Sequence, residues 1–169
     1  MKAKHILLLT GILLFFAGSV FVLHKLSTAL QEKKNQYAIL PAFRLPALNE
    51  EIVSDTTIDR HKVTVFYFFD PDCSLCHAML EQMKTRQEAF AGSQILLVTL
   101  LPEEKIKDFL AEIDFSLPEN IKILLDEDAD LMSLMEIKGI PASLIYRDAI
   151  LIKRFDGPVT IETLIKYLQ

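Results

Sequence analysis

The chain has 169 residues, of which 51% are hydrophobic, so it is long enough to bury the core of one domain. Residues 36–169 carry 13 Lys and Arg against 22 Asp and Glu, a net charge of −9. An acidic domain repels phosphate backbones, so we expect no nucleic-acid partner, and two cysteines are too few for the disulfide scaffold of a small secreted domain.

The N-terminal region is basic and then apolar. Residues 6–23 contain no charge, and this run is just long enough to cross a bilayer as a helix. We predict a membrane anchor over residues 1–25, followed by a polar tether over residues 26–39. A cleaved signal peptide, with a cleavage site at the small residues 17–19, and a helix of a soluble core are the alternatives. The basic start favours export of the rest of the chain.

Residues 40–169 are predicted to form one α/β domain. An extended lead-in with two prolines, residues 37–48, comes first. Residues 63–69 are apolar on both faces, which predicts a central strand. The helix after this strand is expected to bury one face, formed by Met79, Met83, Ala89 and Phe90.

The rest of the domain continues the alternation of strands and helices. We expect strands at residues 94–101, 121–125, 142–147 and 150–155, and helices at residues 102–113, 128–137 and 160–169. The last two strands form a hairpin around Asp148-Ala149, and Thr160 caps the final helix. The order βαβαβαββα predicts a central mixed, mostly parallel sheet that is flanked by helices and has an antiparallel edge.

The two cysteines, Cys73 and Cys76, lie between the strand at 63–69 and a helix-like stretch at 78–90. Thiols three residues apart can close a small disulfide without unfolding the chain. At the first turn of a helix, the leading sulfur meets unpaired backbone N–H groups and the positive end of the helix dipole. Both favour the thiolate, the form that attacks disulfides. The arrangement therefore predicts a dithiol redox centre in which Cys73 is the reactive thiol and Cys76 lies one turn inside.

Other functions of the cysteines stay open at this point. They could form a structural disulfide in a binding module that performs no turnover. Cys73, Cys76 and His77 also fit the attachment pattern of a c-type haem. The same three residues could bind zinc, with His61 as the fourth ligand. Peroxidase activity is a weaker alternative, because a peroxidatic cysteine would need no partner three residues away. We expect no metal and no cofactor, and we expect His77 on the helix surface.

Three acids, Asp126, Asp128 and Asp130, have the spacing that opens a calcium-binding loop. Leu131 occupies the sixth position, where such a loop has Gly, and Ile137 occupies the twelfth, where it has Glu. We therefore expect these acids to cap a helix instead of binding calcium.

Two segments carry a resemblance to a known family. Residues 68–76 read Phe-Phe-Asp-Pro-Asp-Cys-Ser-Leu-Cys, and residues 139–145 read Gly-Ile-Pro-Ala-Ser-Leu-Ile. Together they resemble the thioredoxin superfamily, and most closely its membrane-anchored, redoxin-type members of the TlpA/ResA kind. The resemblance covers about residues 40–169 and implies a thioredoxin-like fold.

The resemblance also implies an activity and its residues. Cys73 would be the nucleophile, Cys76 would resolve the mixed disulfide, Pro141 would be a cis-proline facing the disulfide, and the backbone of Ile140 would pair with the incoming polypeptide. The implied activity is thiol–disulfide exchange that reduces disulfides of exported proteins. The implied partners are a protein disulfide and a membrane or periplasmic electron donor. The implied location is a bacterial inner membrane, crossed once, with the domain on the outer side.

The chain departs from this family at two positions beside the motif. It has no tryptophan, and Asp72 stands where the family has one before the first cysteine. Tyr67 stands where a thioredoxin has a buried Asp, so proton transfer to and from Cys76 must use another group or water. Asp70 and Asp72 add negative charge near Cys73, which disfavours the thiolate and favours a reductant-like centre.

Overall fold

The structure is a computed structural model that describes residues 14–28 and 37–169. Residues 14–28 form a helix, and Tyr37–Gln169 form a compact unit of their own. Within these two ranges, no helix combines the length and the apolar character needed to span a membrane. The membrane segment predicted at residues 6–23 lies partly outside the described residues.

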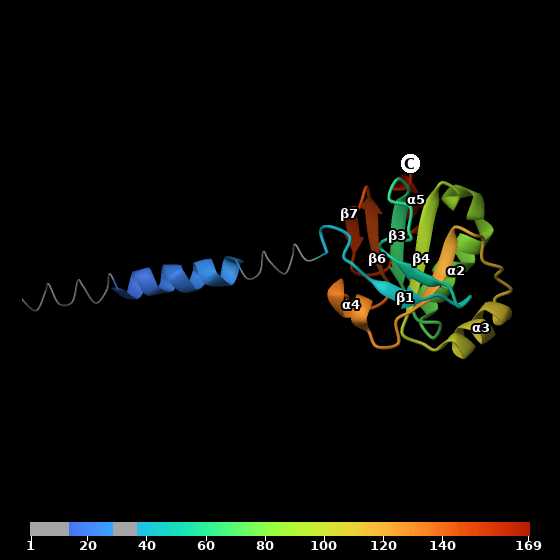
Figure 1. Ribbon diagram of the computed structural model, residues 1–169, viewed down its shortest axis with the longest axis horizontal. Coiled ribbons are helices and arrows are strands. Elements are labelled where there is room, and N and C mark those ends of the chain that lie inside the picture. The colour runs from blue at the N-terminus through green and yellow to red at the C-terminus, as the bar shows by residue number, and fades with distance from the viewer. Residues whose placement is uncertain (1–13, 29–36) are drawn as a thin grey trace, which may run out of the picture. The chain divides into compact units, whose positions relative to one another are not determined.

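A five-stranded sheet forms the centre of the compact unit (Figure 1). β3 (Val63–Phe68) lies in the middle, between β4 (Ser93–Thr99) and β6 (Ala142–Arg147), and the outer strands are β5 (Ile121–Leu125) and β7 (Ile150–Phe155). β3, β4 and β5 are parallel, whereas β6 is antiparallel to both β3 and β7. The central position of β3 confirms the prediction. The predicted antiparallel edge is confirmed, because the β6–β7 hairpin forms one side of the sheet and pairs antiparallel.

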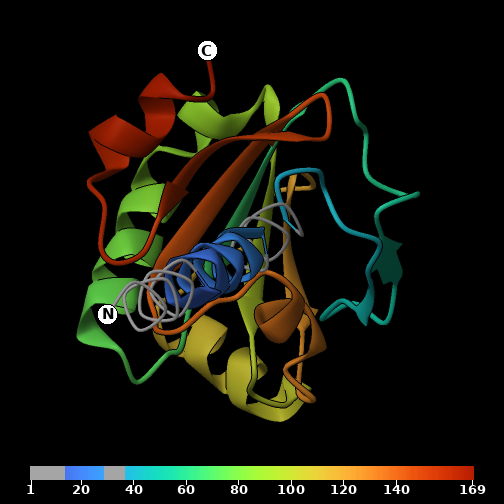
Figure 2. The same cartoon turned by 90° about the vertical axis from the view of Figure 1, so that its left-hand side faces the viewer.

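Helices cover both faces of this sheet. α2 (Ser74–Thr85), α3 (Glu103–Glu112) and α5 (Ile161–Lys166) pack on one face. The other face is covered by α4 (Asp130–Leu134) and by a small antiparallel sheet of two strands, β1 and β2. Figure 2 shows α2 and α5 on the opposite side of the central sheet from β1. From β3 to α5 the order of elements is βαβαβαββα, as predicted.

The small sheet pairs β1 (Arg44–Pro46), which lies in the predicted extended lead-in, with β2 (Ile52–Ser54). β2 was not predicted. Its three residues are too few to show an alternating pattern, so only the pairing with β1 defines it as a strand.

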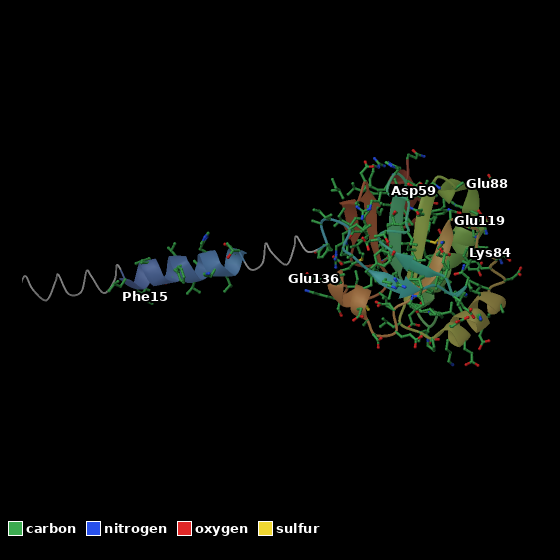
Figure 3. The ribbon with its side chains drawn as sticks, viewed as in Figure 1. Phe15, Asp59, Lys84, Glu88, Glu119 and Glu136 are labelled. Carbon is green, nitrogen blue, oxygen red and sulfur yellow. The ribbon has the colours of Figure 1, made fainter. Side chains whose placement is uncertain are left out.

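All six side chains of β3 are buried because both faces of the sheet are covered. Alternate residues face opposite layers: Val65 and Tyr67 belong to the core beneath α2, and Phe66 belongs to the core beneath α4. Charged side chains lie on the outside, as Asp59 and Glu88 do (Figure 3). This distribution explains why the sequence of β3 shows a continuous apolar run instead of alternation.

Two predicted helices have different bounds in the structure. The helix expected at 78–90 begins earlier, at Ser74, and ends at Thr85, and a separate 3-10 turn, η1 (Gln87–Phe90), follows. Met79, Met83 and Phe90 are buried as predicted, but Ala89 is exposed because the change to a 3-10 turn rotates it away from the core. The helix expected at 128–137 is reduced to the five residues of α4.

Local signals at turns and caps are confirmed. The hairpin between β6 and β7 turns at Asp148 and Ala149, whose φ angles of 50° and 62° give the left-handed pair of a two-residue type I′ turn. The Thr160 hydroxyl accepts a hydrogen bond from the Thr163 N–H at 3.3 Å and caps α5. The Asp126 carboxylate accepts hydrogen bonds from two N–H groups of α4, at 3.1 Å and 2.8 Å, so this acid caps a helix as expected.

Candidate active site

The segment between β3 and α2 turns the chain so that Cys73 lies at the start of the helix. The Phe69 N–H donates to the Val98 carbonyl at 2.9 Å and extends the parallel pairing beyond β3. The Asp70 carboxylate accepts from the Asp72 N–H at 2.8 Å, and the Asp70 carbonyl accepts from the Cys73 N–H at 3.1 Å. These bonds form an Asx-type turn that fixes the backbone immediately before the first cysteine.

The two cysteines differ in accessibility. Cys73 is the N-cap of α2, and its sulfur accepts a hydrogen bond from the Cys76 N–H at 3.4 Å. Both residues are free thiols. Cys73 is half-buried, whereas Cys76 is 0% exposed. The structure therefore brings the two predicted thiols together and leaves only Cys73 open to a macromolecular disulfide.

The second predicted segment lies at the same end of the sheet. The Ile140–Pro141 peptide bond is cis, as predicted. Pro141 directly precedes β6, and Ala142 pairs with Phe68 at the end of β3. This pairing places Ile140 and Pro141 beside the segment that leads from β3 to Cys73. Ile140 is 39% exposed and borders a small, mainly apolar cavity of about 90 Å³ together with residues 69–70.

The comparison with protein families decides the membership of the chain. Residues 37–157 match the model of the AhpC/TSA family. The chain belongs to the AhpC/TSA family. The resemblance to thioredoxin-like oxidoreductases is thereby confirmed at the level of the family. A comparison with curated proteins gives no match.

Solved structures similar to this AhpC/TSA-family chain share its thioredoxin-like fold. StoA from Bacillus subtilis is 22% identical, with a TM-score of 0.64 over 78% of this chain and 99% of StoA. A secreted Mycobacterium tuberculosis disulfide oxidoreductase homologous to E. coli DsbE is 14% identical, with a TM-score of 0.64 over 79% and 96%. A thiol:disulfide interchange protein from Chlorobium tepidum is 15% identical, with a TM-score of 0.65 over 78% and 93%.

The environment of Cys76 holds it as a thiol. Burial raises the pKa of Cys76 from its ordinary value of 9.0 to about 12, and the hydrogen bond with Cys73 acts in the same direction. The backbone of Asp70 and the side chain of Tyr67 lower the pKa, but by less. Cys76 is therefore protonated at neutral pH in this AhpC/TSA-family site, and its attack on a sulfur requires stabilisation of the thiolate.

The reduced protein is expected to lose stability as the pH rises from about 9 toward about 12. The pKa of Cys76 is higher in the folded state than in the unfolded chain, so the unfolded chain gives up this proton first. The contribution of Cys76 to stability is fully present below pH 9.0 and is lost as the pH approaches 12. Urea denaturation of the reduced protein across this range measures the effect. A Cys76→Ala variant should lack this component, and the same pH dependence in both proteins would contradict the assignment.

His77 is half-buried, so it lies only in part on the helix surface where it was predicted. Its ring centroid lies 5.5 Å from that of Phe109, and its Nε2 atom is buried without a hydrogen-bond partner. His77 and Asp72 border an open groove of about 380 Å³ between the CxxC motif and α3. In the part of the chain that the structure describes, no three His, Cys, Asp or Glu side chains converge as metal ligands. Packing against α3 therefore accounts for the position of this ring.

No function in the site was predicted for Tyr67. In the structure Tyr67 is 1% exposed and belongs to the same buried core as Cys76. One signal in the sequence was available. Successive side chains of a strand point to opposite faces of the sheet, and this places Tyr67 on the face that the following helix must cover. The distance between Tyr67 and Cys76 depends on how closely α2 packs against β3, and the sequence does not specify this packing.

Proposed function

We propose that this protein is a thiol–disulfide oxidoreductase that reduces disulfides of exported proteins through Cys73 and Cys76. The observation that carries the proposal is the pair of free thiols at the start of α2, one half-buried and one fully buried. A large disulfide substrate can reach the first sulfur only, and the second sulfur lies within one helical turn of it.

The reaction follows from this difference in access. The Cys73 thiolate attacks a substrate disulfide, forms a mixed disulfide and releases one substrate thiolate, which takes up a proton. Cys76 then loses its proton and attacks the sulfur of Cys73. The Cys73–Cys76 disulfide forms, and the second substrate sulfur leaves as a thiol. The substrate gains two electrons, and an external dithiol must return the two electrons to the protein.

Ile140 and Pro141 are proposed to bind the substrate backbone. Both lie at the sheet end that carries Cys73, and Ile140 is partly exposed there. The cavity beside them gives an apolar side chain of the substrate a place to pack. An extended peptide next to Ile140 would hold its disulfide near the half-buried sulfur of Cys73.

The reduction potential tests this proposal against a structural bridge. We expect a value near that of thioredoxin, about −270 mV, measured by equilibration with glutathione or a dithiol buffer. The purified protein should also reduce a model protein disulfide. A potential well below about −300 mV without reductase activity would favour the structural bridge, and one above about −180 mV would contradict the reductant direction.

Charge near the motif supports the reductant direction. Asp72 is exposed immediately before Cys73, and a negative charge there destabilises the thiolate and therefore the reduced form. In the same potential measurement, Asp72→Asn should raise the potential by on the order of 10 mV, as expected for a screened surface charge. Asp148→Asn, in the distant β6–β7 turn, is the matched control and should leave the potential unchanged.

The N-terminal region is proposed to anchor the domain to the outer side of a bacterial inner membrane, where a membrane or periplasmic dithiol would donate electrons. The support is the uncharged run at residues 6–23. One similar structure is described as an exposed lipoprotein thioredoxin from Streptococcus pneumoniae (16% identical, TM-score 0.59, over 75% of this chain and 97% of that one).

Deletion of residues 1–36 is expected to release a folded, redox-active protein from the membrane fraction, because Tyr37–Gln169 form a compact unit. Fractionation of cells that express the full chain and the shortened chain measures this effect. Full-length protein in the soluble fraction would contradict the anchor. Loss of folding in the shortened chain would show that the deleted residues belong to the core.

A further inference from the structure

Tyr67 is a buried polar residue close to the active-site helix. It belongs to the buried core that α2 forms with β3, and Cys76 belongs to the same core. The exposed fractions of Tyr67 and Cys76 are 1% and 0%. The Tyr67 side chain lowers the pKa of Cys76 and so favours its thiolate. A phenol is therefore buried in the same core as the less accessible sulfur of the pair.

Apart from Cys73, no other polar side chain of the described residues acts on Cys76. Asp126 is the one buried carboxylate among them, and its oxygens accept hydrogen bonds from α4. Ser143 faces Tyr67 across the β3–β6 pair, but its buried hydroxyl has no hydrogen-bond partner and so does not bind Cys76. Asp70 acts on Cys76 through its backbone only. The polar side chains that act on Cys76 are thus Cys73 and Tyr67.

Tyr67 is suited to donate a hydrogen bond and unsuited to act as a base. Burial is the main cause that raises the pKa of Tyr67 far above its ordinary value, and the nearby thiolates act in the same direction. The phenol therefore keeps its proton throughout the reaction. A protonated phenol beside a forming thiolate supplies a charge-assisted hydrogen bond, which is stronger than a bond between neutral groups.

We propose that Tyr67 donates the hydrogen bond that stabilises the Cys76 thiolate when Cys76 resolves the mixed disulfide. The inference rests on the proposed function and assigns a residue to its second step. Cys76 gives up its proton, its thiolate is held by the Tyr67 hydroxyl, and it attacks the Cys73 sulfur. The bond between Cys73 and the substrate sulfur breaks, and the departing sulfur takes up a proton, while Tyr67 keeps its own.

A two-step reaction with dithiobisnitrobenzoate tests the role of Tyr67 in the full-length reduced protein. Attack by Cys73 releases the first nitrothiobenzoate, and attack by Cys76 on the resulting mixed disulfide releases the second. Stopped-flow absorbance follows both releases at one fixed pH. In Tyr67→Phe, we expect the second release to slow about tenfold, which corresponds to the loss of one hydrogen bond to a charged group. The first release should keep its rate, because it does not require the Cys76 thiolate.

Tyr146→Phe is the matched control. Tyr146 is also 1% exposed, but it lies on the other face of the sheet and donates to the Tyr37 carbonyl at 2.8 Å. This variant should keep both rates, and urea denaturation should show that both variants fold. An unchanged second release in Tyr67→Phe, or equal slowing of both releases, would overturn the inference. A wild-type protein that shows no second release would instead contradict the proposed function.

Discussion

Replacing Cys76 by alanine is expected to stop turnover and to leave substrate covalently bound to Cys73. The half-buried sulfur of Cys73 can still attack a disulfide, but no thiol remains within one turn of α2 to release the product. Disulfide reductase activity should fall on the order of 10³-fold or more, as when a group essential for covalent catalysis is removed. Non-reducing electrophoresis and mass spectrometry of protein from the native cells should show the mixed disulfide and identify the bound partner.

Replacing Cys73 by alanine should abolish activity and trap nothing, because Cys76 is buried and protonated. Ser74→Ala, at an exposed position between the cysteines, is the control and should keep most activity. Alkylation of the reduced wild-type protein followed by peptide mapping should modify Cys73 first. Capture of substrate by Cys76 in the Cys73→Ala variant, or faster alkylation of Cys76, would reverse the assigned order.

Replacing Phe66 by alanine is expected to reduce the free energy of unfolding by about 3–5 kcal/mol. Phe66 is 0% exposed, and its ring packs edge-on against Phe43 and Tyr146, with centroids 5.5 Å and 5.7 Å apart. Truncation would remove these contacts and leave a cavity between the sheet and the layer formed by α4 and β1. Such a loss is a large part of the roughly 5–15 kcal/mol that stabilises a typical domain. Urea denaturation monitored by circular dichroism measures the change.

Ile150→Ala is the control for this stability measurement. Ile150 is 59% exposed on the outer strand β7, and its truncation should change stability by no more than about 0.5 kcal/mol. Phe66 lies on the face of β3 opposite the cysteines, so the reduction potential of folded Phe66→Ala should match that of the wild type. A loss of stability below about 1 kcal/mol would mean that the core relaxes into the space left by the ring.

The elements whose signals are local were predicted from the sequence. The continuous apolar run of β3 identified a strand covered on both faces, and the bounds of β5, β6 and β7 agree with the predicted ranges. The two-residue spacing at Asp148-Ala149 identified the hairpin, and Thr160 marked the start of α5. Each signal depends on residues within one turn or one strand, where backbone sterics and nearby hydrogen bonds dominate.

The sequence by itself also determined that two thiols lie three residues apart directly after a buried strand, and this spacing is the basis of the chemistry proposed for the site. Only the tertiary structure placed β6 inside the sheet and brought the Ile140–Pro141 segment beside the turn before Cys73. It also buried Nε2 of His77 and placed Tyr67 in the same core as Cys76. These features depend on contacts between residues far apart in the chain, or on how closely a helix packs on a sheet. Such contacts form only when the helices pack on the two faces of the sheet, and no short stretch of sequence specifies them.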